Sequence, residues 1–253
     1  MKKENVILFF DSGIGGLTTL QKCHKLLPNE NYVYYADYEN MPYGAKDKNV
    51  LKKLIIDKLN SLIDKYSPAI VVIACNTATT LVIADMRVLH PTILFVGTEP
   101  ALIPAIRKHK HILLLATQNT INNSRILKLV SSYFDVLTFG PQDLALKVEN
   151  QFPKLQDLKD DLKTQLLPYF GRCDCVVLGC THYVFCKKII EEIFSLPIYD
   201  GNTGVAKRLK NLLDLFLLHS ADGGIQFANK GEVYTKLVNT YTLIEGWSSC
   251  VEL

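Results

Sequence analysis

Short apolar runs that end in polar residues constrain the fold of this 253-residue chain more than any other feature. Residues 6–10 and 70–74, for example, are entirely apolar, and such runs are typical of strands buried on both faces. Segments with apolar residues three or four positions apart, as in 50–66, separate them and indicate helices. Because strands that alternate with helices form parallel sheets covered on both faces, the chain is predicted to be an α/β protein.

The alternation restarts near residue 98, which indicates a second sheet. We expect strands over 6–10, 32–36, 70–74, 93–96, 112–115, 136–139, 176–178 and 197–199. Helices are expected over 17–27, 50–66, 78–88, 121–131, 155–169, 183–194 and 205–219, with another starting near residue 100. The tail after residue 222 is ambiguous, with Phe227, Val233 and Tyr234 as candidate strand positions.

This order predicts two doubly wound domains with parallel-rich sheets that face each other across a cleft, in a pseudo-symmetric arrangement. The first domain is expected to comprise residues 1–97 plus 206–253. The second, residues 98–205, is an insertion into the first. In such sheets ligands bind at the carboxyl ends of the strands, where polar residues of this chain are concentrated.

Composition and charge limit the functional classes. Hydrophobic residues make up 48% and charged residues 21% of the chain, as in a packed globular protein. A net charge of +3 without long basic blocks gives no basis for binding nucleic acid. No apolar run is long enough to cross a membrane or to act as a signal peptide, so we expect a cytoplasmic protein without membrane contact. Its seven scattered cysteines are then expected to be free thiols.

Two segments, Val-Val-Ile-Ala-Cys-Asn-Thr at 71–77 and Val-Val-Leu-Gly-Cys-Thr at 176–181, are similar to each other. Cys75 and Cys180 therefore follow buried strands in different halves of the chain. A pair of thiols on opposite sides of a substrate carbon could remove a proton from one side and return one on the other. Asn76, Thr77 and the Thr181-His182 pair would supply hydrogen-bond donors and a group that handles protons.

Two further turns could bind anions. Asp-Ser-Gly-Ile-Gly-Gly at 11–16 joins a strand to a helix, where backbone N–H groups attract an anion such as a carboxylate. Its spacing matches neither a dinucleotide-binding loop nor a phosphate-binding loop with Lys-Ser or Lys-Thr. Thr117, Thr120 and Ser124 stand at the start of a helix, as N-caps or as a second anion-binding turn.

Other uses of the cysteines were weighed. Cys173, Cys175, Cys180, His182 and Cys186 form a dense cluster in the sequence, but their spacing does not fit a zinc site, and no metal or cofactor is expected. No Cys-x-x-Cys motif is present to support a thiol redox protein. The remaining residues of these types, expected to be incidental or on the surface, are Cys23, Cys250, His24, His90, His109, His111 and His219.

Taken together and in order, the segments 10–16, 42–44, 74–78, 99–101 and 178–183 resemble the cofactor-independent glutamate racemases of the Asp/Glu racemase superfamily. The resemblance covers about the first 200 residues. It implies two α/β domains that hold glutamate between them and interconvert its L and D forms by deprotonation and reprotonation at Cα. The implied biological role is the supply of D-glutamate for peptidoglycan in the cell wall.

The same resemblance implies the roles of individual residues. Cys75 and Cys180 correspond to the two acid/base groups, and Asp11 and His182 to the residues that assist them. The implied substrate contacts are Asp11, Ser12, Pro42, Tyr43, Gly44, Asn76, Thr77, Thr117, Thr120, Thr181 and His182. Glu149 lies about one residue away from a glutamate that the family can use as an additional catalytic aid, so its role is open. Thr98 stands where the family commonly has an apolar residue.

Two rival functions remain. Aspartate racemases share Cys-Asn-Thr but generally carry Glu after the second Cys-Thr and lack the Asp-Ser-Gly opening, so Asp11 and His182 favour glutamate. A non-catalytic protein that binds acidic amino acids is the rival from a different class, and the intact cysteine pair argues against it. Glutamate is thus the expected small-molecule partner, and a homodimer is a further expectation.

Overall fold

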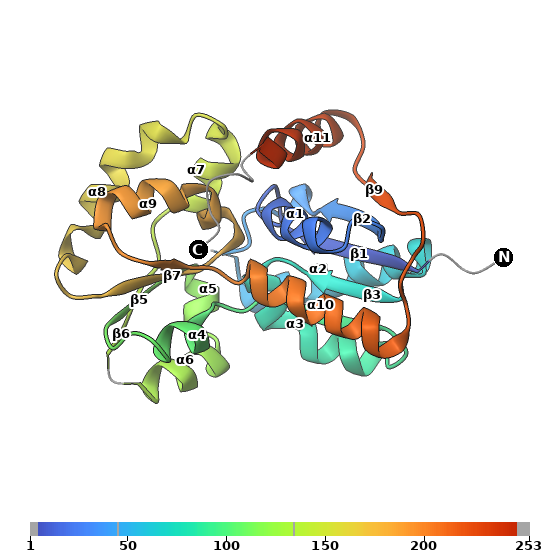
Figure 1. Cartoon of the computed structure of the whole chain (residues 1–253), viewed down its shortest axis with the longest axis horizontal. Coiled ribbons are helices and arrows are strands. Elements are labelled where there is room, and N and C mark those ends of the chain that lie inside the picture. Colours follow the sequence, from blue (N-terminus) through green and yellow to red (C-terminus); the bar gives the residue numbers. More distant parts are fainter. Residues whose placement is uncertain (1–4, 45, 134, 247–253) are drawn as a thin grey trace.

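The computed structural model of the chain describes residues 5–44, 46–133 and 135–246. Cys250 and the outermost residues of the expected first domain lie outside these ranges. Two separate β-sheets, each flanked by helices, form the molecule (Figure 1). The strands are β1 (Val6–Asp11), β2 (Asn31–Ala36), β3 (Ile70–Ile73), β4 (Leu94–Gly97), β5 (Ile112–Ala116), β6 (Val136–Phe139), β7 (Cys175–Gly179), β8 (Ile198–Tyr199) and β9 (Gly224–Phe227).

All strand pairings among the described residues are parallel, which confirms the predicted α/β class. The first sheet has the order β4-β3-β1-β2-β9, and the second has β6-β5-β7-β8. Viewed from its other edge, the second sheet reads β8-β7-β5-β6, which repeats β4-β3-β1-β2 of the first. This repeated order supports the expected pseudo-symmetry, which stays a prediction. The strands that precede the two cysteines, β3 and β7, occupy equivalent interior positions.

Helices connect the strands and cover the sheets. The α-helices are α1 (Leu17–Leu26), α2 (Lys48–Tyr66), α3 (Asn76–Leu89), α4 (Leu102–Ile106), α5 (Gln118–Ile121), α6 (Ser124–Ser131), α7 (Leu144–Gln151), α8 (Lys159–Leu166), α9 (Lys187–Phe194), α10 (Asn202–Phe216) and α11 (Gly231–Glu245). Short 3-10 helices are η1 (Tyr38–Asn40), η2 (Leu155–Leu158), η3 (Leu167–Tyr169) and η4 (Thr181–Cys186). Within the described ranges, no helix is long and apolar enough to cross a membrane.

The chain returns to the first sheet through α10, which packs against α1, and then adds β9 to the sheet edge (Figure 1). This is the route expected for an inserted second domain. The expected boundary between residues 205 and 206 falls inside α10, and the division into two domains stays a prediction. We use "first half" for the elements around the first sheet and "second half" for those around the second.

The prediction for part of the tail was wrong. Phe227 lies in β9, as considered, but Val233 and Tyr234 lie in α11. Their types favour a strand, yet the buried apolar residues of this segment, Leu237, Tyr241 and Ile244, are spaced three and four apart. Packing of that helical face therefore outweighs local strand propensity.

Three expected helices differ in continuity or type, and two helices, α7 and α11, were not predicted. The segment 183–194 begins in the 3-10 helix η4 and continues as α9. The helix expected over 121–131 is divided because the Asn123 side chain accepts a hydrogen bond from the Arg125 N–H and starts a new helix, α6. The segment 155–169 is helical throughout but changes from 3-10 to α and back.

The hydroxyl group of Thr98, directly after β4, is buried in a way that lowers the stability of the fold. The Thr98 side chain is buried, and among the described residues its Oγ1 has no hydrogen-bond partner. The neighbouring Thr79 Oγ1, in contrast, donates to the Ile73 carbonyl (2.9 Å) and accepts from the Thr98 N–H (3.0 Å). An unpaired buried hydroxyl destabilises the folded state, whereas a paired one does not.

Thr98→Val is therefore expected to raise the free energy of unfolding by about 1 kcal/mol, measured by urea denaturation. Thr79→Val is the matched control with the opposite sign, and it should lower that free energy by about 1–3 kcal/mol because it removes two buried hydrogen bonds, leaving the Thr98 N–H and the Ile73 carbonyl bonded only to each other at 3.1 Å. A loss of stability in Thr98→Val would contradict the assignment.

Candidate active site

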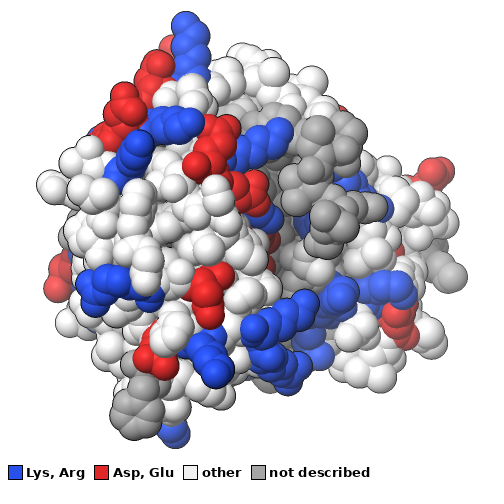
Figure 2. Space-filling view, turned by 60° about the vertical axis from the view of Figure 1, so that its left-hand side comes forward, with Lys and Arg blue, Asp and Glu red and all other residues white. Residues whose placement is uncertain are grey.

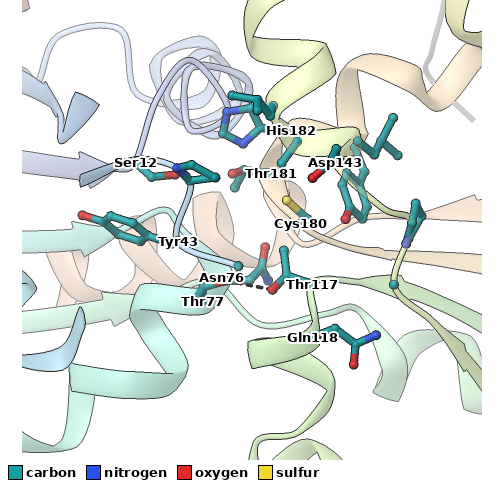
Figure 3. A pocket seen from close by; sticks show the side chains of 18 of the residues that line it. Ser12, Tyr43, Asn76, Thr77, Thr117, Gln118, Asp143, Cys180, Thr181 and His182 are labelled. Carbon is teal, nitrogen blue, oxygen red and sulfur yellow. Dashed lines mark hydrogen bonds between the residues drawn. The ribbon is translucent and has the colours of Figure 1, made fainter. Parts of the chain in front are cut away.

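A cavity of about 240 Å³ lies where the carboxyl ends of the two sheets meet (Figure 3). Both halves contribute to it, and both Cys75 and Cys180 line it. The other predicted site residues in its wall are Ser12, Pro42, Tyr43, Gly44, Asn76, Thr77, Thr117, Thr181 and His182. Asp11 and Thr120 are fully buried and lie behind the wall rather than in it. The structure thus brings together residues from segments more than 100 positions apart.

Cys75 ends the turn after β3 and precedes the first turn of α3. Burial raises the pKa of its thiol well above the ordinary value, and the nearby Asp11 carboxylate and Cys180 raise it further. The N–H groups of Ala78 and Thr77 at the helix start act in the opposite direction but do not outweigh burial. Cys75 is therefore a protonated thiol at neutral pH.

Cys180 follows β7 and lies beside His182, which is on η4 (Figure 3). Burial alone would lower the pKa of His182, but hydrogen bonds with Cys180 and Glu149 raise it to about 10. His182 is therefore an imidazolium at neutral pH. Cys75 faces a carboxylate and Cys180 faces a cation, so the two thiols occupy opposite electrostatic environments.

Asp11 connects the two halves behind the cavity. Its carboxylate accepts hydrogen bonds from the Gly13 N–H (3.0 Å) and from the Thr181 hydroxyl of the second half (3.1 Å). Burial raises the pKa of Asp11, although the charge of His182 and these hydrogen bonds oppose the shift. Asp11 thereby fixes the segment that follows Cys180.

Glu149, whose role the sequence left open, lies on α7 and is 2% exposed. Its Oε2 accepts from the Ile14 N–H (2.8 Å) and lies 2.9 Å from His182 Nε2. Hydrogen bonds from His182, Lys236 and Tyr38 outweigh burial, which would raise the pKa of Glu149, and lower it to about 2. The glycine-rich turn therefore binds a carboxylate, as its sequence predicted, but in this structure Asp11 and Glu149 of the chain itself provide it.

Hydroxyl groups join the halves on the other side of the cavity. Thr77 Oγ1 on α3 lies 2.9 Å from Thr117 Oγ1, which caps α5 by accepting from the Thr120 N–H (3.3 Å) (Figure 3). Thr120 Oγ1 accepts from Thr117 Oγ1 at 3.1 Å. Thr117 is thus the N-cap of α5 and also lies in the cavity wall, and its role in binding an anion stays a prediction. Ser124, by contrast, follows the cap of α6 and lies outside the cavity wall.

The Pro42–Gly44 loop is held in place from both halves. The Tyr43 hydroxyl donates to Asp37 Oδ2 (2.5 Å), and its carbonyl accepts from the Asn119 amide of α5 (3.0 Å). Gly44 lies so close to α5 that a Cβ there would be 3.0 Å from the Thr117 side chain. Asp37, which follows β2, thus fixes the Tyr43 ring from outside the cavity wall.

Several wall residues were missed by the sequence interpretation. These are Met41, Gln118, Tyr183 and the segment from Gly140 to Leu146, which connects β6 to α7. They carry no charged motif, apart from Asp143. A usable signal was present, because Gly140-Pro141 directly follows the expected strand 136–139 and so had to lie at a carboxyl strand end.

The cysteine-rich cluster in the sequence does not form one site. Cys175 starts β7 and Cys180 follows its end, so the strand separates them. Among the described residues, the one group of three or more side chains whose potential metal-ligand atoms all lie within 4.8 Å of one another is His109, Asp174 and Cys175, at the amino end of β7. It lies at the end of the strand away from the cavity.

Only two of the five histidines expected at the surface are exposed. His111 and His219 are exposed, whereas His24, His90 and His109 are half-buried, with ring nitrogens bonded to Tyr241, Asn60 and Tyr199. The expectation of surface histidines was therefore too simple for these three. Cys23 is a buried core residue of α1.

Surface charge is mixed. On the face shown in Figure 2, acidic and basic side chains are interspersed over much of the view, and basic side chains gather along the edge of a hollow. A groove elsewhere than the thiol cavity is lined by Lys108, Lys187, Lys207 and Arg208, but also by Glu99, Glu191 and Asp200. Lys187 and Asp200 are paired there at 3.3 Å.

The Glu149–His182 pair predicts how stability depends on pH. The folded-state pKa of Glu149, about 2, lies below its ordinary 4.5, so its contribution is complete above pH 4.5 and is lost toward pH 2. The folded-state pKa of His182, about 10, lies above its ordinary 6.5, so its contribution is complete below pH 6.5 and is lost as pH rises to 10.

We therefore expect the free energy of unfolding to fall between pH 6.5 and pH 10 by at least about 1 kcal/mol more in the wild-type protein than in His182→Asn. Urea denaturation at several pH values measures it. His111→Asn, which alters an exposed histidine, is the control and should follow the wild-type curve. Parallel curves for the wild type and His182→Asn would contradict the prediction.

Comparison with known proteins places this geometry in a family. Residues 17–209 match the family model described as Asp/Glu/Hydantoin racemase. The glutamate racemase of Clostridium perfringens is 38% identical over 220 residues, which is 84% of this chain and 84% of that protein. The glutamate racemase of Bartonella henselae is 38% identical over 228 residues, covering 85% of this chain and 84% of that protein.

A solved structure is also similar. The crystal structure of Escherichia coli glutamate racemase in complex with L-glutamate and the activator UDP-MurNAc-Ala has a TM-score of 0.83 and 25% sequence identity, covering 95% of each chain. The family match extends over most of the chain and includes both cysteines of the cavity. This chain therefore belongs to the Asp/Glu/Hydantoin racemase family.

Proposed function

We propose that this protein interconverts L- and D-glutamate without a cofactor, by moving a proton to and from Cα with two thiols. The observation that supports this most directly is that Cys75 and Cys180 line one cavity from equivalent strands of the two sheets. The Cα proton of an amino acid is weakly acidic. Its removal requires a desolvated base close to the carbon, and inversion requires an acid on the opposite face.

The proton balance needs both sulfurs. In one direction the Cys180 thiolate takes the Cα proton and becomes a thiol, and the Cys75 thiol donates its proton to the other face of Cα and becomes a thiolate. The reverse reaction exchanges these roles. His182, an imidazolium, is hydrogen-bonded to Cys180, and the Asp11 carboxyl group lies near Cys75, so each sulfur has one assisting group beside it.

The substrate carboxylates need donors in a site that excludes water. Hydroxyl, amide and backbone groups of Ser12, Asn76, Thr77, Thr117 and Thr181 surround the cavity and supply them (Figure 3). The Pro42–Gly44 loop closes one side, and Thr120 orients Thr117. We propose these residues as substrate contacts because they lie in or behind the cavity wall and most of their side chains carry hydrogen-bond donors.

Glutamate is favoured over aspartate for two reasons. The relatives at 38% identity are named glutamate racemases, and His182 occupies the position where aspartate racemases generally carry Glu. The proposed biological role is to supply D-glutamate for peptidoglycan. The protein itself is proposed to be cytoplasmic. The six cysteines that the structure describes are free thiols, which supports a reducing compartment. A homodimer stays a prediction.

The test is a circular-dichroism assay of the purified protein with D-glutamate and, separately, D-aspartate, with EDTA present. We expect the circular-dichroism signal of D-glutamate to disappear, while that of D-aspartate stays unchanged. The glutamate formed in heavy water should carry deuterium at Cα. Activity on aspartate alone would overturn the substrate assignment. Activity that EDTA abolishes would overturn the cofactor-free mechanism.

A further inference from the structure

Lys236, on the C-terminal helix α11, forms an ion pair with the carboxylate that contacts the histidine of the proposed site. Its Nζ lies 2.7 Å from Glu149 Oε1 and also donates to the Glu149 carbonyl at 2.7 Å. Helix α11 packs on α1 and β9 of the first half, whereas α7, which carries Glu149, packs on η4 of the second half. Figure 1 shows α11 and α7 near each other at the top of the molecule.

The two carboxylate oxygens of Glu149 contact different groups. Oε1 receives Lys236 and the Tyr38 hydroxyl, and Oε2 receives the Ile14 N–H and faces His182 Nε2. Lys236 also lies over the ring of Tyr38, 5.3 Å from its centroid, which adds a cation–π attraction. Since four donors saturate the carboxylate, its rotation is restricted and Oε2 stays directed at His182.

We propose that Lys236 is a positioning residue for the racemase reaction: it orients Glu149 and limits how tightly Glu149 holds the proton on His182. This inference rests on the proposed function for its effect on catalysis. Lys236 is 35% exposed at its side chain whereas Glu149 is 2% exposed, so the lysine brings a solvated charge to a buried acid.

The direction of the effect follows from the charges. The Glu149 carboxylate favours the imidazolium form of His182, and the Lys236 ammonium on the far side of the carboxylate offsets part of this field. Two other groups, Cys180 and Asp11, interact electrostatically with His182. Two others, Tyr38 and Tyr34, interact electrostatically with Glu149. Lys236→Met keeps all four of these groups and removes only the cation–π contact between Lys236 and the Tyr38 ring.

Opposite shifts are therefore expected from two substitutions. Lys236→Met removes the offsetting cation, so His182 should hold its proton more tightly and its pKa should rise. Glu149→Gln removes the anion, so that pKa should fall. A lysine that only stabilised the fold would lower activity or melting temperature without moving the titration of His182.

The experiment is a titration of the protein with ¹⁵N-labelled histidine, followed by NMR between pH 7 and pH 12, with His182→Asn to assign the signal. In Lys236→Met the titration should move up by at least about half a pH unit, and in Glu149→Gln it should move down by about one or more. Lys236→Arg, which keeps the charge, should restore the wild-type curve. Lys230→Met, at an exposed lysine just before α11, is the matched control and should leave it unchanged.

Steady-state kinetics give the second readout. We expect kcat of Lys236→Met to fall about tenfold, with the alkaline limb of the kcat/KM profile displaced in the same direction as the NMR titration. An unchanged His182 titration in Lys236→Met, in a protein that melts as a folded domain, would overturn the inference. If the wild-type protein did not racemise glutamate, the proposed function would fail, but the NMR titration would still decide the role of Lys236.

Discussion

Cys75→Ala and Cys180→Ala are each expected to reduce glutamate racemisation by about 10³-fold or more, because each removes one of the two groups that transfer the Cα proton. Neither substitution should unfold the protein, since both side chains line a cavity rather than fill the centre of a sheet. The circular-dichroism assay measures the loss. Cys23→Ala, at a buried free thiol of α1 outside the cavity wall, is the control and should retain turnover.

The two variants should also differ from each other. A variant with one thiol can still remove the Cα proton of the enantiomer that faces it and return a solvent proton to the same side. We therefore expect each variant to exchange the Cα hydrogen of one enantiomer only, with complementary preferences, when followed by NMR in heavy water. Exchange of both enantiomers by one variant would mean that a single base reaches both faces and would contradict the two-thiol arrangement.

Gly13→Ala is expected to lower kcat/KM by about 100-fold and the free energy of unfolding by about 1–3 kcal/mol. A Cβ at this position would lie 2.2 Å from Glu149 Oε2 and 3.1 Å from His182 Nε2. Glu149 cannot withdraw without losing its hydrogen bonds to Ile14 and Lys236, so the added methyl group displaces the pair that flanks Cys180. Steady-state kinetics and urea denaturation measure the two effects.

The control for this substitution is Gly204→Ala. Gly204 lies on α10, and a Cβ there would have no neighbour within 4 Å. Alanine is the better helix former by about 1 kcal/mol, so this variant should be slightly more stable and fully active. Comparable losses in both variants would show that the close contact at Gly13 is not the cause.

Much of the framework could be predicted from local pattern. Each interior strand appears in the sequence as an apolar run, because burial on both faces excludes polar residues, and the polar residue after each run marks a carboxyl strand end. This pattern is why the sequence alone predicts that Cys75, Cys180 and Thr117 lie in one cavity. The ordered set of motifs then restricted the chemistry to a racemase.

Contacts between the halves could not be predicted in this way. Ile14 and Glu149 are hydrogen-bonded across 135 positions of the chain, and no local propensity encodes such a pairing. Glu149 also lies on α7, whose short sequence carries a weak helical pattern. The position of Lys236 could not be predicted for a different reason. Val233 and Tyr234 beside it favour a strand, and only packing against α1 and β9 makes the segment helical.

The sheet order also has a consequence for synthesis on the ribosome. Every strand of the second sheet lies between residues 112 and 199, whereas the first sheet needs β9, at Gly224–Phe227, to complete its edge against β2. Chains grow from the N-terminus, and domains generally fold as units when their residues have emerged. We therefore expect the later-starting sheet to be finished first, while the sheet that begins the chain waits, incomplete, for its last strand to be translated.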